Sequence, residues 1–308
     1  MTAPRQTVQT GGLRPGGQSA AASQQTGPRR ALIVAHGQPS DPDPAEAALA
    51  RLAAEVAARL PAGWQVDSAT LAAPAALEAA LTRGGGAPLL IYPMFIADGW
   101  FTQVNLPARI RAAGIELAGW ERKGSGAAGS GGSCREPDCR GPAGEAAETA
   151  DAPPAAGPRA RILPPFGLDD GILPLALQML RAELSRDGLR ASDVRLIVAA
   201  HGSFKSPAPA LVARRLGWAI MAELPFAELR TAFIDQTPRI ADLAAGLAAP
   251  AYCLPFFAAA GGHVGQDLPA ALAQAAFSGR ILAPLGLADR APDLIAAALL
   301  AGSGDSAS

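Results

Sequence analysis

Short apolar runs alternate along the chain with longer stretches in which apolar residues recur at helical spacing. The run 196–200 contains no polar residue, which is typical of a strand buried on both faces of a sheet. The stretch that follows it has helical spacing at Leu211, Leu216, Ala219 and Ile220. Prolines suited to the first turn of a helix are expected to start four helices, at Pro74, Pro107, Pro238 and Pro269. This alternation predicts parallel sheets with right-handed crossovers.

The pattern occurs twice. ALIVAHG at 31–37 reappears as RLIVAAHG at 195–202, the segment 88–95 matches 250–257, and 161–168 matches 280–287. Order and spacing agree throughout, apart from one insertion in the first copy. We therefore predict an α/β fold of two tandem, doubly wound parallel-sheet lobes that face a central cleft.

The predicted boundaries follow from the repeat. The first lobe spans 31–190 and the second 191–301, with expected disordered extensions at 1–30 and 302–308. A Gly/Ala/Ser/Pro-rich insertion at 123–158 has no apolar periodicity and is expected to be flexible, because it cannot bury enough surface to offset its ordering entropy.

Charge and composition narrow the classes of function. The formal net charge of −1 gives no general attraction to nucleic acid or to a membrane surface. No apolar stretch is long enough to span a bilayer, and the N-terminus lacks the apolar core of a secretory signal. Three cysteines do not form a disulfide framework, so a cytoplasmic location is expected.

All three histidines of the chain follow predicted strands. In open α/β sheets, ligands bind beyond the carboxyl ends of the strands, where the strand order reverses. His36 follows the first strand of copy one and His201 the first strand of copy two, whereas His263 follows the third strand of copy two. The second copy therefore has two imidazoles at one predicted sheet edge. Phe101 occupies the position of His263 in the first copy, so that site is incomplete.

Two motifs of the second copy resemble a known family. VAAHGS at 198–203, together with LPFFAAAGGH at 254–263 and Asp267-Leu-Pro269, resembles the class II tetrapyrrole chelatases. The similarity is greatest to the sirohydrochlorin cobalt- or ferrochelatases (CbiX/SirB-type) in their long, duplicated form. It covers residues 31–119 and 160–300 and implies two lobes enclosing a cleft.

The resemblance implies that His201 and His263 are the metal-site and catalytic residues. It implies a lyase-class enzyme that inserts Co²⁺ or Fe²⁺ into a carboxylate-rich tetrapyrrole such as sirohydrochlorin, in cobalamin or siroheme biosynthesis. The metal is then a substrate, and no tightly bound cofactor is expected. Imidazole suits both ions, and it accepts a proton near neutral pH.

Further residues are expected to contact the macrocycle. From the second copy these are Ser203, Lys205, Gly261 and Gly262; from the first they are His36, Asp98, Trp100 and Phe101. Helix capping by Ser203, turn chemistry for the glycines, a structural role for His36 and core packing for the aromatic residues are the alternatives. Substrate carboxylates could pair with Lys205, Arg214, Arg215 or Arg239, and Asp235 could assist the metal or a proton, or cap a helix.

Other interpretations compete with this one. Histidine phosphatases have an arginine directly before the histidine, where this chain has Ala35 and Ala200. A non-catalytic metal or tetrapyrrole carrier would explain the degenerate first copy. Cys134 and Cys139 could bind metal or be inert. The choice of metal, the macrocycle and the oligomeric state stay open, with a monomer preferred because one chain supplies both lobes.

Overall fold

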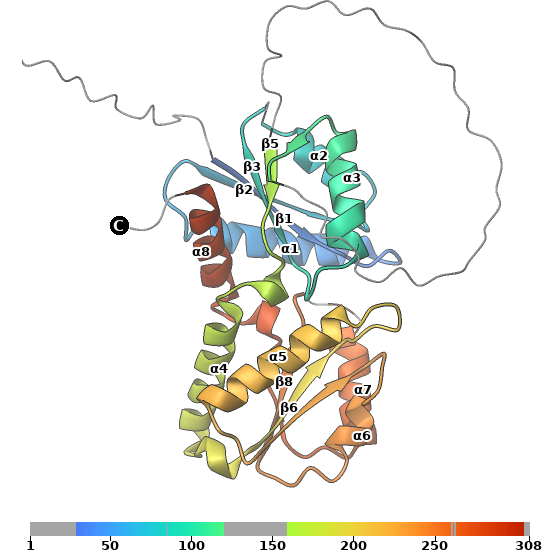
Figure 1. Cartoon of the computed structure of the whole chain (residues 1–308), viewed down its shortest axis with the longest axis vertical. Coiled ribbons are helices and arrows are strands. Elements are labelled where there is room, and N and C mark those ends of the chain that lie inside the picture. Colours follow the sequence, from blue (N-terminus) through green and yellow to red (C-terminus); the bar gives the residue numbers. More distant parts are fainter. Residues whose placement is uncertain (1–28, 85, 120–158, 260, 262, 305–308) are drawn as a thin grey trace, which may run out of the picture.

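The computed structural model describes residues 29–84, 86–119, 159–259, 261 and 263–304, and for His263 the backbone alone (Figure 1). The predictions for residues 1–28, the insertion with Cys134 and Cys139, Gly262 and residues 305–308 therefore lie outside the described residues. Arg29 and Arg30 of the expected N-terminal extension lie in a strand, and Gly302 and Ser303 of the expected tail lie in a helix. Among the described helices, none has the length and apolar character needed to cross a membrane.

Each copy forms an open parallel sheet, as predicted. The first sheet has the order β2-β1-β3-β5-β4, with β1 (Arg29–Ala35), β2 (Trp64–Thr70), β3 (Leu89–Pro93), β4 (Glu116–Leu117) and β5 (Arg159–Ile162). The second has the order β7-β6-β8-β9, with β6 (Arg195–Ala200), β7 (Glu228–Phe233), β8 (Ala251–Phe256) and β9 (Arg280–Ile281). All strand pairs are parallel.

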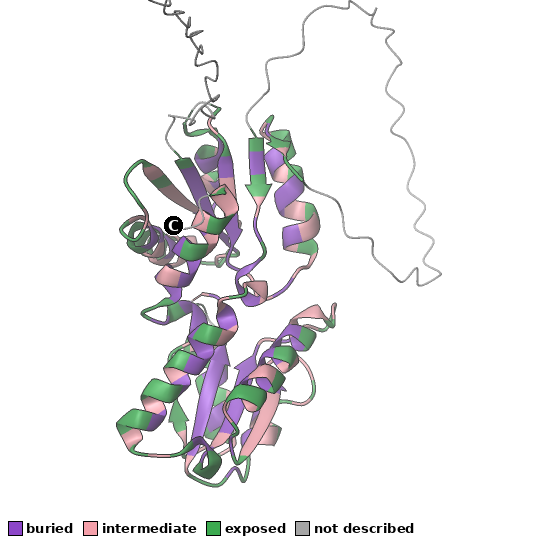
Figure 2. Ribbon diagram, turned by 60° about the vertical axis from the view of Figure 1, so that its left-hand side comes forward, coloured by how far each residue is buried: buried purple, intermediate pink, exposed green. Residues whose placement is uncertain are grey.

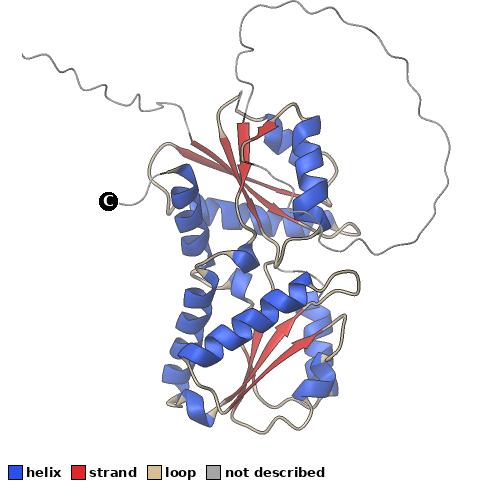
Figure 3. Cartoon of the chain, in the orientation of Figure 1, coloured by secondary structure: helices blue, strands red, loops and turns tan. Residues whose placement is uncertain are grey.

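Helices follow the strands in the predicted alternation (Figure 3). The first copy contains α1 (Pro42–Ala57), α2 (Ala76–Thr82), α3 (Leu106–Ala112) and α4 (Ile172–Asp187); the second contains α5 (Ala208–Glu223), α6 (Ile240–Ala244), α7 (Leu268–Gln274) and α8 (Ala291–Ser303). Short π-helical turns, η1 (Phe101–Asn105) and η4 (His263–Asp267), lead into α3 and α7.

The prolines are only partly where the sequence pattern predicted them. Pro107 and Pro269 lie in the first turns of α3 and α7. Pro74 and Pro238 instead lie in loops two residues before α2 and α6. Proline fixes φ wherever it stands, so it marks the approach to a helix as well as its first turn.

The two lobes exchange their last helices. Helix α8 belongs to the second copy but packs on α1 and β3 of the first sheet, while α4 of the first copy packs along α5 of the second lobe (Figure 1). Polar contacts support both placements: Arg59 pairs with Asp293 of α8, and Arg280 of β9 pairs with Asp187 of α4. The sequence repeat and the packing unit therefore differ by one helix.

A single apolar core runs through both lobes. It includes inward faces of β1, β6 and β8 and the apolar sides of α1, α4, α5 and α8. Separate clusters lie beneath α2 and α3 on the first sheet and beneath α6 and α7 on the second. The central strands are buried and the outer helix faces are exposed (Figure 2). The shared core joins the two sheets directly.

The segments that lead from one lobe into the exchanged helices α4 and α8 pack tightly against two loops. The segment before α4 contacts the loop after β3, and the segment before α8 contacts the loop after β8. Gly167 donates to Phe95 O at 3.0 Å, and a Cβ at this residue would lie 2.1 Å from Ile96 O. Gly286 does the same to Phe257 O at 2.9 Å, and its Cβ would lie 2.0 Å from Ala258 O. Only glycine permits this approach, which anchors both loops to the passages between the lobes.

Candidate active site

The predicted strand neighbours are present in both lobes. β1 lies between β2 and β3, and β6 lies between β7 and β8, so the strand order reverses at these central strands. Ala200, the last residue of β6, pairs with Phe256, the last residue of β8. The loops that carry His201 and His263 therefore leave the sheet side by side.

His201 lies directly after β6, with its ring nitrogen Nδ1 close to two acceptors. Nδ1 is 3.0 Å from Gly202 O and 3.4 Å from Asp235 Oδ2, and Asp235 N donates to His201 O at 2.9 Å. The side chains of His201 and Asp235 are 34% and 33% exposed. Two acceptors on one side of the ring favour a proton on Nδ1, so that in the neutral ring Nε2 carries the lone pair.

Gly202 permits the turn that presents His201. Its φ is +74°, and a Cβ at this residue would lie 2.7 Å from Gln236 Cγ and 3.0 Å from Phe233 Cβ. A side chain here would be strained in φ and would collide with the β7 loop. Gly202 therefore lets the loops after β6 and β7 pack closely, which brings Asp235 to His201.

The first lobe provides a template for the position of His263. His263 is the first residue of η4, as Phe101 is of η1, and both π-helical turns run directly into the next α-helix. In the first lobe the rings of His36 and Phe101 have centroids 4.3 Å apart. The backbone of His263 therefore stands in the second lobe where that of Phe101 stands in the first.

Around Phe101 the first lobe has an aromatic group instead of a second imidazole. Phe95 stacks on Phe101 at 6.0 Å between centroids, and Trp100 meets its edge at 5.1 Å. Trp100 is 60% exposed, so it is not core packing. The first lobe also has no counterpart of the Asp235 carboxylate. At the matching position stands Ala72, whose N–H donates to His36 O as that of Asp235 donates to His201 O.

Asp98 orders the loop that carries these aromatic residues. Its Oδ1 accepts hydrogen bonds from Gln103 Nε2 at 2.6 Å and from Thr102 Oγ1 at 3.4 Å. Thr102 is buried and also accepts the N–H of Gly99. We therefore assign Asp98 to loop geometry and keep Trp100 and Phe101 as candidates for substrate contact.

Ser203 and the nearby cations of the second lobe lie in the loops beside His201. Ser203 Oγ accepts the N–H groups of Lys205 and Ser206, so it shapes the loop before α5. Lys205 is exposed. Arg239 donates to Ile234 O, and its guanidinium lies 5.8 Å from the centroid of the exposed Phe204 ring.

The other two arginines are on α5. Arg214 lies over Phe233 at 5.5 Å and Arg215 is exposed. Arg214 is thus held against the end of β7, whereas Lys205 and Arg239 belong to the loops that follow β6 and β7.

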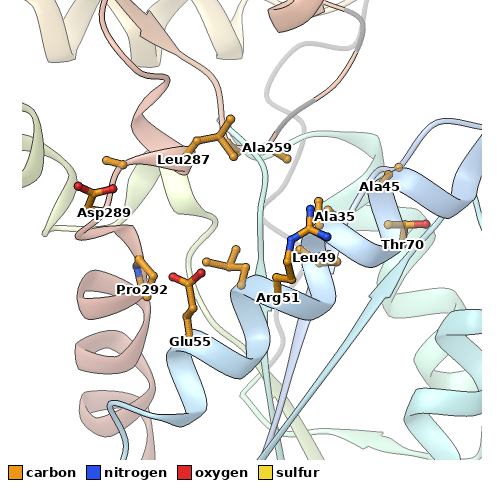
Figure 4. A pocket seen from close by; sticks show the side chains of 16 residues that line it. Ala35, Ala45, Leu49, Arg51, Glu55, Thr70, Ala259, Leu287, Asp289 and Pro292 are labelled. Carbon is orange, nitrogen blue, oxygen red and sulfur yellow. The ribbon is translucent and has the colours of Figure 1, made fainter.

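A pocket of about 380 Å³ lies between the lobes on the α1 side of the same sheet edges (Figure 4). Ala35 and Gly37, which flank His36, line it, as do Ala258 and Ala259, which lie in the loop between β8 and His263. Arg51, Glu55 and Asp289 are its charged residues. The sequence pattern did not identify this pocket, because its walls combine α1 with the passage into α8 and depend on the helix exchange.

His201, with Asp235 beside its Nδ1, does not by itself complete a metal site. Among the side chains that the structure describes, no three His, Cys, Asp or Glu residues cluster as they would in a closed metal site. A metal that is to be passed on needs an open and weak site, since closed structural sites retain their ion. This edge of the second lobe has the chemistry of such an open site.

Comparisons with known proteins agree with this geometry. The CbiX family model matches residues 195–300. The chain is 39% identical to CbiX, the terminal enzyme for biosynthesis of siroheme in denitrifying bacteria; the match covers 89% of this chain and 99% of that one, with a TM-score of 0.68.

Two further structures share the fold. SirB from Bacillus subtilis with Fe³⁺ is 12% identical, and the match covers 90% of this chain and 97% of that one, with a TM-score of 0.57. SirB from B. subtilis subspecies spizizenii in complex with cobalt has the same identity and coverage, with a TM-score of 0.55. No curated protein matches the sequence.

Proposed function

The chain belongs to the CbiX family of class II chelatases, and from this premise we propose that it inserts Co²⁺ or Fe²⁺ into sirohydrochlorin or a similar carboxylate-rich tetrapyrrole. The pathway is that of siroheme or cobalamin. The 39% identity to an enzyme of siroheme biosynthesis favours siroheme. The same proposal includes a monomer in the cytoplasm, with one chain supplying both sides of the site.

One observation carries the proposal: His201 lies at the end of β6 with Asp235 beside its Nδ1, in a loop adjacent to the one that begins η4 at His263. The carboxylate orients the ring, as partners of metal-bound histidines do. His201 and His263 together hold the ion through two imidazoles, which bind Co²⁺ and Fe²⁺ without completing their coordination.

Insertion replaces two pyrrole N–H protons by one divalent ion, so two protons must leave the macrocycle. In the proposed mechanism, His201 or His263 accepts a proton as the metal moves to the pyrrole nitrogens. Asp235 faces the positive charge that develops on His201, at 3.4 Å from Nδ1. Water accepts the second proton from the exposed side of the site.

The first lobe forms the opposite wall. Trp100, which is 60% exposed, and the adjoining Phe101 provide aromatic surface for a flat macrocycle. Lys205 and Arg239 provide positive charge beside the metal site for peripheral carboxylates. Binding thus depends on both lobes, whereas the metal chemistry belongs to the second lobe alone.

The alternative is a metal or tetrapyrrole carrier, which the loss of His and carboxylate from the first lobe suggests. An anaerobic absorbance assay with sirohydrochlorin and either Co²⁺ or Fe²⁺ separates the two functions. We expect insertion faster than the spontaneous rate, and its loss in His201→Ala and in His263→Ala. Arg190→Gln, which removes an exposed ion pair with Asp193, is the matched control and should retain activity.

Macrocycle binding without turnover in the wild-type protein would instead support the carrier. Normal turnover in both histidine variants would refute the site while leaving the family assignment intact. Circular dichroism of each variant shows whether lost activity reflects the site or the fold.

A further inference from the structure

A second, smaller pocket lies at the amino end of the first sheet, away from the candidate active site. Its volume is about 210 Å³, and its lining residues are Arg30, Leu81, Thr82, Gly86, Ala87, Leu89, Ala113, Ile115 and Arg159. β1 runs from Arg29 to Ala35, so Arg30 is near its start and His36 follows its end. The pocket therefore lies at the end of the first sheet opposite to the end that carries His36.

Arg30 is a buried cation whose hydrogen bonding is incomplete. Its side chain is 3% exposed, its Nη2 donates to Ala80 O at 3.1 Å, and it lies 3.8 Å from Asp67 Oδ2. Its Nε has no hydrogen-bond partner within the part of the chain that the structure describes. Buried donors of charged groups are nearly always paired, so this one calls for a water or ligand oxygen.

The surroundings leave a positive surplus. The carboxylate of Asp67 also pairs with Arg83 at 3.1 Å, so two guanidinium groups share one carboxylate. Arg159, in the pocket wall, lies 3.4 Å from Glu116, and both side chains are more than half exposed. Three arginines thus face two carboxylates, which gives a surplus of one positive charge beside the pocket.

The loop over the guanidinium is shaped to its presence. Gly84 has φ +86°, and a Cβ at this residue would lie 2.6 Å from Arg30 Nε. In the second lobe the matching residue is Arg195, which is only half-buried and donates to Ala248 O at 3.3 Å. A Cβ at Gly246, the residue that matches Gly84, would meet nothing within 4 Å. The packing of a buried arginine beneath this glycine is therefore specific to the first lobe.

We propose that this pocket binds a small aliphatic monocarboxylate. Its carboxylate would pair with Arg30 and Arg159, the two guanidinium groups of the lining, and its hydrocarbon part would contact Leu81, Leu89 and Ile115. Thr82 Oγ1 donates to Glu78 O and Ala79 O, so it does not add a donor for a more highly charged anion. One surplus charge and an apolar wall suit a monoanion with a short chain better than phosphate.

Isothermal titration of the full chain with acetate, butyrate, hexanoate and inorganic phosphate tests the proposal. We expect one butyrate per chain, bound more tightly than acetate, and no saturable binding of phosphate. Arg159→Gln should weaken butyrate binding about tenfold, as for the loss of one charge-assisted hydrogen bond. Ala113→Leu should abolish it by filling the pocket, because Ala113 lines it from the end of α3.

Arg195→Gln is the matched control and should bind butyrate as the wild type does. The proposal is overturned if no carboxylate gives saturable binding, if phosphate binds more tightly than butyrate, or if Arg195→Gln loses as much affinity as Arg159→Gln. Loss of binding in Lys205→Gln would place the carboxylate at the active site and would equally refute it. Thermal melting of every variant, recorded without ligand, identifies any that fails to fold.

Discussion

Replacing Phe101 by His should create a second metal site in the first lobe. The ring centroids of His36 and Phe101 are 4.3 Å apart. Two nitrogens bound to one ion at about 2.0–2.1 Å each lie within roughly 4.2 Å of one another. Ring nitrogens lie at the edge of the ring, so rings with centroids this close can bring two nitrogens within that distance and share an ion. We expect Phe101→His to bind one more equivalent of divalent metal than the wild type.

The substitution should lower the stability of the fold, and the ring contacts of Phe101 indicate by how much. Phe101 loses its pairs with Phe95 and Trp100, each worth about 0.5–1.5 kcal/mol. The two pair contributions together are therefore at most about 3 kcal/mol, and the imidazole ring and the partial exposure of this residue reduce the loss. A fall in Tm of a few degrees is expected, without loss of the fold.

Equilibrium dialysis with Co²⁺, with the visible spectrum of the bound ion as a second readout, measures the added site. The double variant Phe101→His, His36→Ala must lose the added equivalent. Addition of Ala72→Asp to Phe101→His should raise its affinity about 10- to 100-fold, since Ala72 stands where the second lobe has Asp235. A folded Phe101→His variant with no added equivalent would refute the equivalence of the lobes on which the His201–His263 site rests.

Three other predictions follow from the described contacts. Asp235→Asn should lower the affinity for Co²⁺ about 10- to 100-fold in the same dialysis assay while leaving the melting temperature within a few degrees, because it removes the carboxylate beside His201 Nδ1. Burial raises the pKa of the Asp169 carboxyl, to which Tyr92 donates. The folded state therefore holds the carboxyl proton of Asp169 more tightly than the unfolded state does. The stability that this proton contributes is lost as pH rises from about 4 through the raised pKa. Urea unfolding of Asp169→Asn across this range should show a smaller loss with pH than the wild type, and equal slopes would contradict the assignment. Burial also raises the pKa of the Cys253 thiol to about 12. In a chain with Cys134 and Cys139 replaced by Ser, Ellman's reagent should therefore label Cys253 only after unfolding. Rapid labelling of the native protein would contradict the burial of Cys253.

The strand pattern predicted the two sheets and their central neighbours, because strands buried on both faces read as continuous apolar runs. It did not predict β4, whose two residues, Glu116 and Leu117, are too few for any periodicity. It also did not show the helix exchange. Periodicity identifies the apolar side of α8 but carries no information about which sheet that side covers.

At the site, the sequence placed the histidines and left their neighbours undecided. Residues that follow parallel strands must meet at one sheet edge, so the positions of His36 and His201 could be inferred from topology alone. Whether Ser203 and Asp98 contact a ligand or order their loops could not, because both roles need the same polar side chains in the same loops. The hydrogen bonds of Ser203 Oγ with Lys205 N and of Asp98 Oδ1 with Gln103 Nε2 show that both side chains order their loops.

The exchange of α4 and α8 explains how the residues at the ends of the two sheets can differ between the lobes while the fold persists. The inner face of each sheet is covered by a helix from the other copy, so neither copy buries its core without its partner. His36 lies outside this core, exposed at the end of β1, and Ala72 follows β2 in the adjoining loop. Changes at such positions leave the shared core intact, so the two copies can carry different residues at the carboxyl ends of their sheets without loss of the fold.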